Sequence, residues 1–438
     1  MKKIMRFLEE HVVPIAAKMG GQKHLSAIRD GFVAIMPLII LCSFAILLNG
    51  FPWKPLPNLL DKIFGVSAEG AGYWKNFGGY IWTGTFAIMS PLVCFATSYS
   101  LAKSYEVDGL GAGITALAAL MMLYATANGG FPLDYLGASG LFVALIVALL
   151  VTQLFVKLMK SPKLLIKMPE GVPPAVARSF AALFPVMITL SVVSLVNCIL
   201  VTLGVTNVHE LVFKVIQRPL QGAAQGLGWA VLLAFVIHLL WFFGLHGPNI
   251  LLAITNPLYM PALEENVKAF GNGVSNFNVP NIIVPQFFDA FVYMGGSGTT
   301  IGLLLAIYIA SRKKKSALME QYKGVANLAL APGIFNINEP VVFGMPIVLN
   351  PVLAIPFIIT PIVLVLVTYF AMSTGLVPKV VAAPPWTFPP IISGLTAVAS
   401  WRGAVLSIIN LAISIVIYLP FVLVGHDKEV VVDKGISG

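Results

Sequence analysis

The sequence predicts an all-α polytopic membrane protein with about ten transmembrane helices and two re-entrant hairpins. Of its 438 residues, 58% are hydrophobic and only 10% are charged, whereas a soluble globular chain carries about 25% charged residues. The hydrophobic residues form runs of about 20 residues, the length that an α-helix needs to cross a bilayer. Two further apolar segments are rich in proline, which a regular lipid-facing helix excludes because backbone groups would be left without partners.

The charge balance and the cysteines exclude several other classes of protein. The chain has 27 Lys and Arg against 18 Asp and Glu, a net charge of +9, which fits the positive-inside bias of membrane proteins. With so few charges in total, we expect no nucleic-acid partner. No CxxC motif or Cys/His cluster is present, so we expect no metal, no cofactor and no structural disulfide. The three cysteines all lie within apolar runs: Cys42, Cys94 and Cys198.

The apolar runs predict the spans in order along the chain. Residues 1–30 are mixed in charge and lack the apolar core of a signal peptide, so we expect an amphipathic segment at the cytoplasmic membrane surface or an ordinary solvated helix. The run 248–263 is short and predicts a broken or oblique tenth span. The nine clear spans lie at about 31–49, 79–102, 109–127, 138–158, 179–204, 226–245, 285–310, 348–373 and 403–424.

The positions of Lys and Arg predict the orientation of these spans. With ten spans, two hairpins and a cytoplasmic N-terminus, most of the 27 Lys and Arg fall in cytoplasmic loops, including the run SRKKKS at 311–316. This asymmetry follows the positive-inside rule. We therefore expect both termini in the cytoplasm, with 426–438 as a cytoplasmic tail.

Two proline-rich segments predict the re-entrant hairpins. Residues 324–346 read GVANLALAPGIFNINEPVVFGMP, and residues 380–399 read VVAAPPWTFPPIISGLTAVA. Irregular backbone at membrane depth survives only inside protein or beside a water-filled cavity. Both segments are therefore expected near a binding site.

An amphipathic segment, residues 206–224, divides the chain into two halves. The spans before it, in residues 31–205, contain almost no polar or ionisable residues that stand out from the apolar pattern. Nearly all such residues lie in the spans after it, in residues 225–425. We interpret the first half as a scaffold, the second as the substrate-binding half, and 206–224 as their connector.

Ionisable residues inside spans are rare and usually functional. His246 lies in WFFGLHGPNI, where glycine and proline break the helix, and Glu339 lies in the apolar hairpin FNINEPVVFG. Either residue could instead serve structure, His246 as an interhelical hydrogen-bonding group and Glu339 as a helix cap. His238, on an unbroken helix, favours a packing role, and Asp289 is either a functional carboxylate or an interfacial cap.

Amides and aromatic residues accompany these two candidates. Asn338 and Asn249 adjoin Glu339 and His246, and Trp386 lies between two proline pairs in PPWTFPP, where it could stack on a sugar ring or anchor at the interface. Convergent amides, a carboxylate, a histidine and aromatic rings are typical of a site for a neutral polyhydroxylated ligand. Trp241, one turn before the His246 break, is a second candidate for stacking.

Four segments together resemble a known family, the membrane-embedded enzyme IIC of the bacterial phosphoenolpyruvate-dependent sugar phosphotransferase system, in its lactose/cellobiose/diacetylchitobiose branch. They are HLSAIRDGFVAIMPLII, FFGLHGPNI, FNINEPVVFGMPIVLNP and PPWTFPPIISG. The resemblance covers essentially the whole chain. It implies a multi-pass protein of the bacterial plasma membrane, a homodimer formed by the N-terminal half, and elevator-like alternating access.

The resemblance also implies the substrate and the roles of residues. The essential glutamate, histidine and hairpin tryptophan of the family fall on Glu339, His246 and Trp386. The expected function is translocation of a β-linked disaccharide, of cellobiose or diacetylchitobiose type, whose 6-hydroxyl is phosphorylated by a phosphocysteine on a cytoplasmic enzyme IIB, with enzyme IIA upstream. We expect IIB to be a separate chain. Whether the permease is itself an enzyme stays open. The alternatives are an ion-coupled secondary sugar carrier and an enzyme acting on a lipid-linked sugar.

Overall fold

The computed structural model describes residues 21–49, 55–67, 72–124, 135–166, 168–169, 171–205, 207–313, 316–345, 347–348 and 351–436. Within these ranges the chain is helical, and its only β-type pairing is one bridge between Val66 and Gly72. Most of the expected surface segment, residues 1–20, lies outside the described residues. Part of the expected cytoplasmic tail continues the last helix as far as Ile436.

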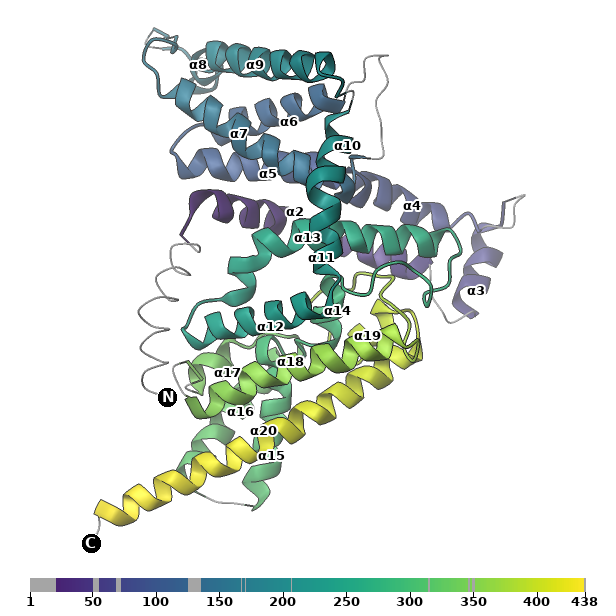
Figure 1. Ribbon diagram of the computed structural model, residues 1–438, viewed down its shortest axis with the longest axis vertical. Coiled ribbons are helices and arrows are strands. Elements are labelled where there is room, and N and C mark those ends of the chain that lie inside the picture. The colour runs from purple at the N-terminus through teal and green to yellow at the C-terminus, as the bar shows by residue number, and fades with distance from the viewer. Residues whose placement is uncertain are drawn as a thin grey trace.

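The N-terminal half forms one block of helices (Figure 1). Its core is built from small residues, which allow membrane helices to approach closely. At Gly113 an added Cβ would lie 2.8 Å from the ring of Phe95, so glycine sets the distance between two of these helices. The helices are α2 (Lys23–Asn49), α3 (Pro55–Phe64), α4 (Lys75–Gly84), α5 (Met89–Ser104), α6 (Gly109–Tyr124), α7 (Leu141–Met159), α8 (Pro174–Ala181) and α9 (Leu183–Thr202).

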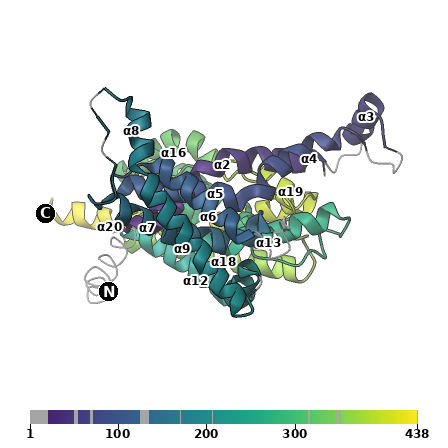
Figure 2. The same ribbon diagram turned by 90° about the horizontal axis from the view of Figure 1, so that it is seen from above.

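The C-terminal half forms the other block, and the connector runs between the two. The connector holds α10 (Val208–Val212), a π-helical turn and α11 (Arg218–Ala224), and its axis bends by 79° into the next helix. In the view from above, α3 and the C-terminal end of α20 project from opposite sides of the molecule (Figure 2). The remaining helices are α12 (Leu227–Phe242), α13 (Gly247–Gly271), α14 (Pro285–Phe291), α15 (Thr300–Lys313), α16 (Ala317–Ile334), α17 (Glu339–Gly344), α18 (Pro351–Ser373), α19 (Ile392–Ala397) and α20 (Trp401–Ile436).

Each of the ten predicted spans coincides with a helix or a broken helical segment. Among the described residues, five helices are long and apolar enough to cross a membrane unbroken, or six if the bent pair at the connector counts as one span. Several apolar spans are thus confirmed, while the total of ten and the two re-entrant hairpins stay predictions. The five are Lys75–Ser104, Ala138–Met159, Leu183–Thr202, Val352–Ser373 and Trp401–Leu423.

Two spans differ in shape from the prediction. The run 285–310 is broken between α14 and α15, where Gly295, Gly296 and Gly298 all have positive φ angles, a conformation that glycine adopts without steric cost. The short run after LHGP belongs to α13, a helix of 25 residues. Hydropathy underestimated α13 because its last turns carry charged side chains that are satisfied within the protein.

The two proline-rich segments are irregular where the sequence predicts it. In the first, α16 and α17 are separated by Phe335–Asn338, and Asn336 has φ +62°. In the second, residues 374–391 contain no helix before α19. These two irregular segments and the glycine break before α15 meet at one place, which is the site described below.

Helix α13 lies between the two blocks and contacts both (Figure 1). Its buried Glu264 accepts a hydrogen bond from the backbone N–H of Ser139 in the N-terminal half (3.2 Å) and pairs with Lys268 (3.0 Å). Two residues later, Asn266 hydrogen bonds to Asn281 and to the carbonyl of Val380 in the C-terminal half. Two residues within one turn of a single helix therefore hold opposite halves of the molecule.

Candidate functional site

A cavity of about 700 Å³ lies where the broken segments meet. Most of its wall belongs to the C-terminal half, and α2 of the N-terminal half closes one side with Val33 and Met36. This volume is within the range of about 300–1,000 Å³ that is typical of small-molecule sites. The polar side chains that line it are His246, Asn249, Thr255, Asn256, Tyr259, Asp289, Tyr293, Ser297, Asn336, Asn338, Glu339 and Trp386.

His246 caps the N-terminus of α13 and faces the cavity. Its Nδ1 accepts a hydrogen bond from the backbone N–H of Asn249 (3.2 Å), so the neutral imidazole carries its proton on Nε2. The adjacent Gly247 permits this turn, because a Cβ there would lie 2.2 Å from the carbonyl oxygen of Ile237 on α12. The local sequence therefore fixes which nitrogen of His246 presents a hydrogen to a ligand.

Glu339 begins α17 and lies beside His246. The distance from His246 Nε2 to Glu339 Oε1 is 3.8 Å, and the two side chains are 37% and 47% exposed. A direct N–H···O hydrogen bond is shorter, about 2.7–3.2 Å, so the two side chains are close but not hydrogen bonded to each other. The two candidates singled out in the sequence are thus together on the cavity wall, with a donor and an acceptor available.

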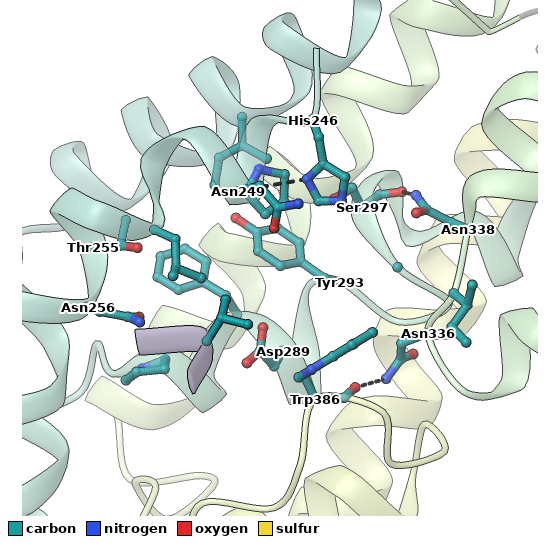
Figure 3. A pocket seen from close by; sticks show the side chains of 18 of the residues that line it. His246, Asn249, Thr255, Asn256, Asp289, Tyr293, Ser297, Asn336, Asn338 and Trp386 are labelled. Atoms are coloured by element: carbon teal, nitrogen blue, oxygen red, sulfur yellow. Dashed lines mark hydrogen bonds between the residues drawn. The ribbon is translucent and has the colours of Figure 1, made fainter. Parts of the chain in front are cut away.

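Asn336 and Asn338 hold the backbone around the cavity. The side-chain oxygen of Asn336 accepts from the N–H of Gly295 (2.7 Å), and its amide donates to the carbonyls of Trp386 and Phe388 (Figure 3). Asn338 donates to the carbonyl of Ser297 (2.8 Å). These amides replace the backbone partners that the breaks remove, which lipid cannot supply. We predicted Asn338 as a sugar ligand; here its amide nitrogen braces the loop.

The two candidate tryptophans occupy different environments. Trp386 is 41% exposed and lines the cavity. Trp241 is 1% exposed and does not line the cavity; its ring lies behind His246, with 4.5 Å between the ring centroids. In this conformation Trp241 supports the imidazole, which differs from the stacking role predicted for it.

His238 has the packing role that its unbroken helix predicts. Its ring is fully buried, bonds to the carbonyl of Ala234 (2.6 Å) and accepts from the N–H of Gly298 (2.7 Å). Tyr418 donates to the carbonyl of the same glycine (2.6 Å). Side chains from α12 and α20 therefore fix the break before α15.

Several polar residues of the cavity were weighted too low or missed from sequence. Asp289 lines the cavity, although its position at the start of an apolar run favoured an interfacial cap. Tyr293, Thr255 and Ser297 were not singled out at all. The available signal was the sequence DAFVYMGGSG, in which Asp289 and Tyr293 are four residues apart, directly before the glycines that break the span.

The cavity is acidic and offers no site for a metal. Its lining contains Asp289, Glu339 and His246 but no Lys or Arg. Among the described residues, no group of three or more His, Cys, Asp or Glu side chains could hold a metal ion. Carboxylates with amides and hydroxyls suit a ligand rich in hydrogen-bond donors, such as a sugar.

Comparison with known proteins identifies the family. Residues 29–361 match the model of the family described as Phosphotransferase system, EIIC. The chain belongs to this EIIC family. An EIIC relative, the lichenan permease IIC component of Bacillus subtilis (strain 168), is 40% identical over 96% of this chain and 93% of its own length. The cellobiose-specific EIIC component of Geobacillus stearothermophilus is 39% identical, with coverage of 96% and 94%.

A solved EIIC structure has the same fold. It is the crystal structure of the transporter ChbC, the IIC component from the N,N′-diacetylchitobiose-specific phosphotransferase system, with a TM-score of 0.90 and 37% identity over 98% of this chain and 99% of that chain. The resemblance stated from sequence motifs is therefore confirmed. This EIIC chain is an integral membrane permease component that binds sugar and works with EIIB and EIIA partners.

Proposed function

We propose that this EIIC chain carries a β-linked disaccharide, of cellobiose or diacetylchitobiose type, across the bacterial plasma membrane and presents it to a separate phosphorylated EIIB. The names of the similar relatives and of the solved structure support this class of sugar. The observation that carries the proposal is the pair His246 and Glu339, 3.8 Å apart on the wall of a cavity without Lys or Arg.

The pair suits a sugar hydroxyl, which is both a donor and an acceptor. Glu339 accepts the hydroxyl hydrogen, and the Nε2–H of His246 donates to the hydroxyl oxygen. Because Nδ1 already accepts from Asn249, His246 orients the hydroxyl, and Glu339 is the acceptor of its proton. Asn249 and Asn338 add amide contacts, and Trp386 stacks on a ring.

Phosphoryl transfer then traps the sugar. The hydroxyl oxygen attacks the phosphorus of the EIIB phosphocysteine, the P–S bond breaks and the thiolate leaves with EIIB, while the hydroxyl proton passes to Glu339. Once Glu339 has passed that proton on to water, the phosphate of the product lies beside its carboxylate, and the lining offers no Lys or Arg to pair with it. Repulsion between like charges favours release of the product.

The transport cycle requires the site to be exposed first outward and then inward. We assign this to an elevator-like movement of the C-terminal half against the N-terminal half, with both termini cytoplasmic and the bent connector between them. The N-terminal half also forms the homodimer. Helix α9 supports this, because only 11% of its apolar window is buried in one chain, which leaves a face for a second copy or for lipid.

The first test is Glu339→Gln in purified protein, with binding of cellobiose and diacetylchitobiose measured by calorimetry. Losing a charged acceptor costs about 1.5–3 kcal/mol, a drop of about 10- to 150-fold in affinity. Glu320→Gln on the exposed side of α16 is the matched control and leaves affinity unchanged. Equal binding by wild type and Glu339→Gln would remove Glu339 from the site.

The second test measures sugar uptake into membrane vesicles that contain this protein. Sugar accumulation requires phosphoenolpyruvate and the soluble phosphotransferases. Uptake driven by a proton gradient alone, with those components absent, would replace the proposal with an ion-coupled carrier.

A further inference from the structure

A second cavity, of about 260 Å³, lies on the other side of α13 from the sugar cavity. One short stretch of α13, residues 252–259, lines both of them. Its residues that face the sugar cavity are Leu252, Thr255, Asn256 and Tyr259, and those that face the second cavity are Ala253, Ile254, Pro257 and Leu258. This stretch is therefore the wall between the two cavities.

The second cavity is bounded by both halves of the molecule and by the connector. Its other lining residues are Phe142 and Leu145 of α7, Leu220 and Ala223 of α11, and Trp229 of α12. The lining contains no ionisable side chain, which excludes a charged or sugar-like ligand. Any molecule in this cavity contacts the scaffold, the connector and the substrate-binding half at once.

The cavity adjoins the hydrocarbon of the bilayer. The connector bends by 79° into α12 and runs across the direction of the spans (Figure 1), as an amphipathic helix in the membrane interface does. Leu220, Trp229 and Ile254 are exposed in the chain, and exposed apolar surface of this kind on a membrane protein contacts lipid. Apolar cavities stay dry and accept apolar ligands. The ligand that the bilayer supplies there is an acyl chain.

The connector also offers a cation for the head group of a lipid. Lys214 is already paired with Glu210, whereas Arg218 is exposed and, among the described residues, makes no hydrogen bond or ion pair. Long basic side chains at the membrane interface attract anionic lipids. Arg218 precedes Leu220 by two residues on the same short helix, so one phospholipid reaches both the arginine and the cavity.

We infer that the second cavity binds one acyl chain of an anionic phospholipid, whose phosphate pairs with Arg218, and that this chain supports the wall of the sugar site from behind. Pro257 has no backbone N–H, so the carbonyl of Ala253 lacks its helical partner and this turn of α13 depends on packing. Sugar and lipid both fit the conformation in which the two cavities exist together. Binding of either one therefore favours binding of the other.

The first test detects the lipid by native mass spectrometry of purified protein with dioleoyl phosphatidylglycerol added. Wild type is expected to retain one lipid. Ala253→Phe fills the cavity from α13 and should weaken binding roughly tenfold or more, because buried methylene groups of the chain are displaced. Ala223→Phe fills it from the exposed connector and gives the same loss if Ala253→Phe does not yield monodisperse protein. The control is Leu232→Phe, an exposed position of α12 outside the lining, which retains the lipid.

The second test separates the head group from the chain. Dioleoyl phosphatidylcholine has the same chains but no net charge, so phosphatidylglycerol is expected to bind about fivefold more tightly. Arg218→Gln should remove this difference and leave binding of phosphatidylcholine unchanged. Equal binding of the two lipids by wild type would overturn the assignment of the phosphate to Arg218.

The third test measures cellobiose affinity by calorimetry with and without phosphatidylglycerol. Affinity is expected to rise with the lipid in wild type and in Leu232→Phe, and not to respond in Ala253→Phe. A bound lipid that leaves wild-type affinity unchanged would overturn the support of the sugar wall.

Two results would overturn the lipid site itself. One is retention of the lipid at the wild-type level by folded Ala253→Phe and Ala223→Phe, and the other is an equal loss in Leu232→Phe. The mass spectra require no sugar, so they stand apart from the proposed function. Wild-type protein that binds no cellobiose in either condition would overturn that function and not the lipid site.

Discussion

The two halves of the molecule satisfy their polar groups in different ways. In the N-terminal half, buried hydroxyls of two neighbouring helices bond to each other, as Ser98 on α5 does to Thr152 on α7. In the C-terminal half, buried amides and a histidine bond to the backbone of broken helices, as Asn336 and His238 do. The first pattern joins intact helices, and the second replaces a missing part of one.

This difference explains where a binding site can form in the membrane. In an intact helix the backbone N–H and C=O groups hydrogen bond to one another, so only side chains are available to a ligand. A break leaves backbone N–H and C=O groups free and lets side chains point into a cavity. The broken segment is stable only if side chains elsewhere in the protein hydrogen bond to its backbone. The C-terminal half therefore depends more strongly on single residues than the scaffold does.

The largest effect is expected at Gly298. A Cβ there would lie 2.2 Å from the ring of Phe357, and the residue has φ +81°. We expect Gly298→Ala to cost about 3 kcal/mol or more from strain and overpacking, seen as a lower thermal midpoint in detergent. Gly324→Ala on α16, where no atom lies within 4 Å, is the control and stabilises by about 0.5–1 kcal/mol. Equal midpoints would show that the break is not tightly held.

Asn336 comes next. Asn336→Ala removes three hydrogen bonds, among them the buried one from the N–H of Gly295, which we expect to cost about 2–4 kcal/mol and to weaken sugar binding through Trp386. The control is Asn327→Ala, which removes one exposed bond to Tyr308 and costs under about 1 kcal/mol. Thermal unfolding and calorimetry of both variants make the comparison. A similar loss for the two asparagines would contradict the idea of a backbone clamp.

The smallest effect is expected in the scaffold. Ser98→Ala leaves the Thr152 hydroxyl without its partner, but that hydroxyl can turn to a carbonyl of its own helix. Interhelical hydrogen bonds in membrane proteins average about 0.6 kcal/mol, so the thermal midpoint should hardly move. A loss as large as that of Asn336→Ala would erase the contrast between the halves.

The helices could be predicted from sequence because lipid imposes one solution on the backbone. Each predicted apolar run falls on a helix or a broken helical segment of the described residues, and proline marked the segments around Asn336 and Trp386 as irregular. The break within 285–310 was not predicted, since its glycines are as compatible with close packing in an unbroken helix. The charged end of α13 was missed because hydropathy does not register that Glu264 has partners inside the protein.

The site was predictable only in part. His246 and Glu339 stood out because an ionisable residue in an apolar run is expensive without a function. Asp289 did not, because a carboxylate at a span terminus also has an ordinary interfacial interpretation. The orientation of Trp241 could not be predicted: its spacing from His246 places it one turn away, but only the packing of α12 decides whether its ring faces the ligand or the back of the imidazole.

The contacts of α13 limit how the halves can move. Glu264 ties this helix to Ser139, while Asn266 ties it to Asn281 and Val380. Any sliding of one half past the other must break one of these two attachments, because both cannot stay intact along a single rigid rod. Asn249 and Asn256, which line the cavity, belong to the same helix. If the contact with Ser139 breaks, these residues move with the C-terminal half and the bound sugar. If the contacts with Asn281 and Val380 break instead, they stay with the N-terminal half.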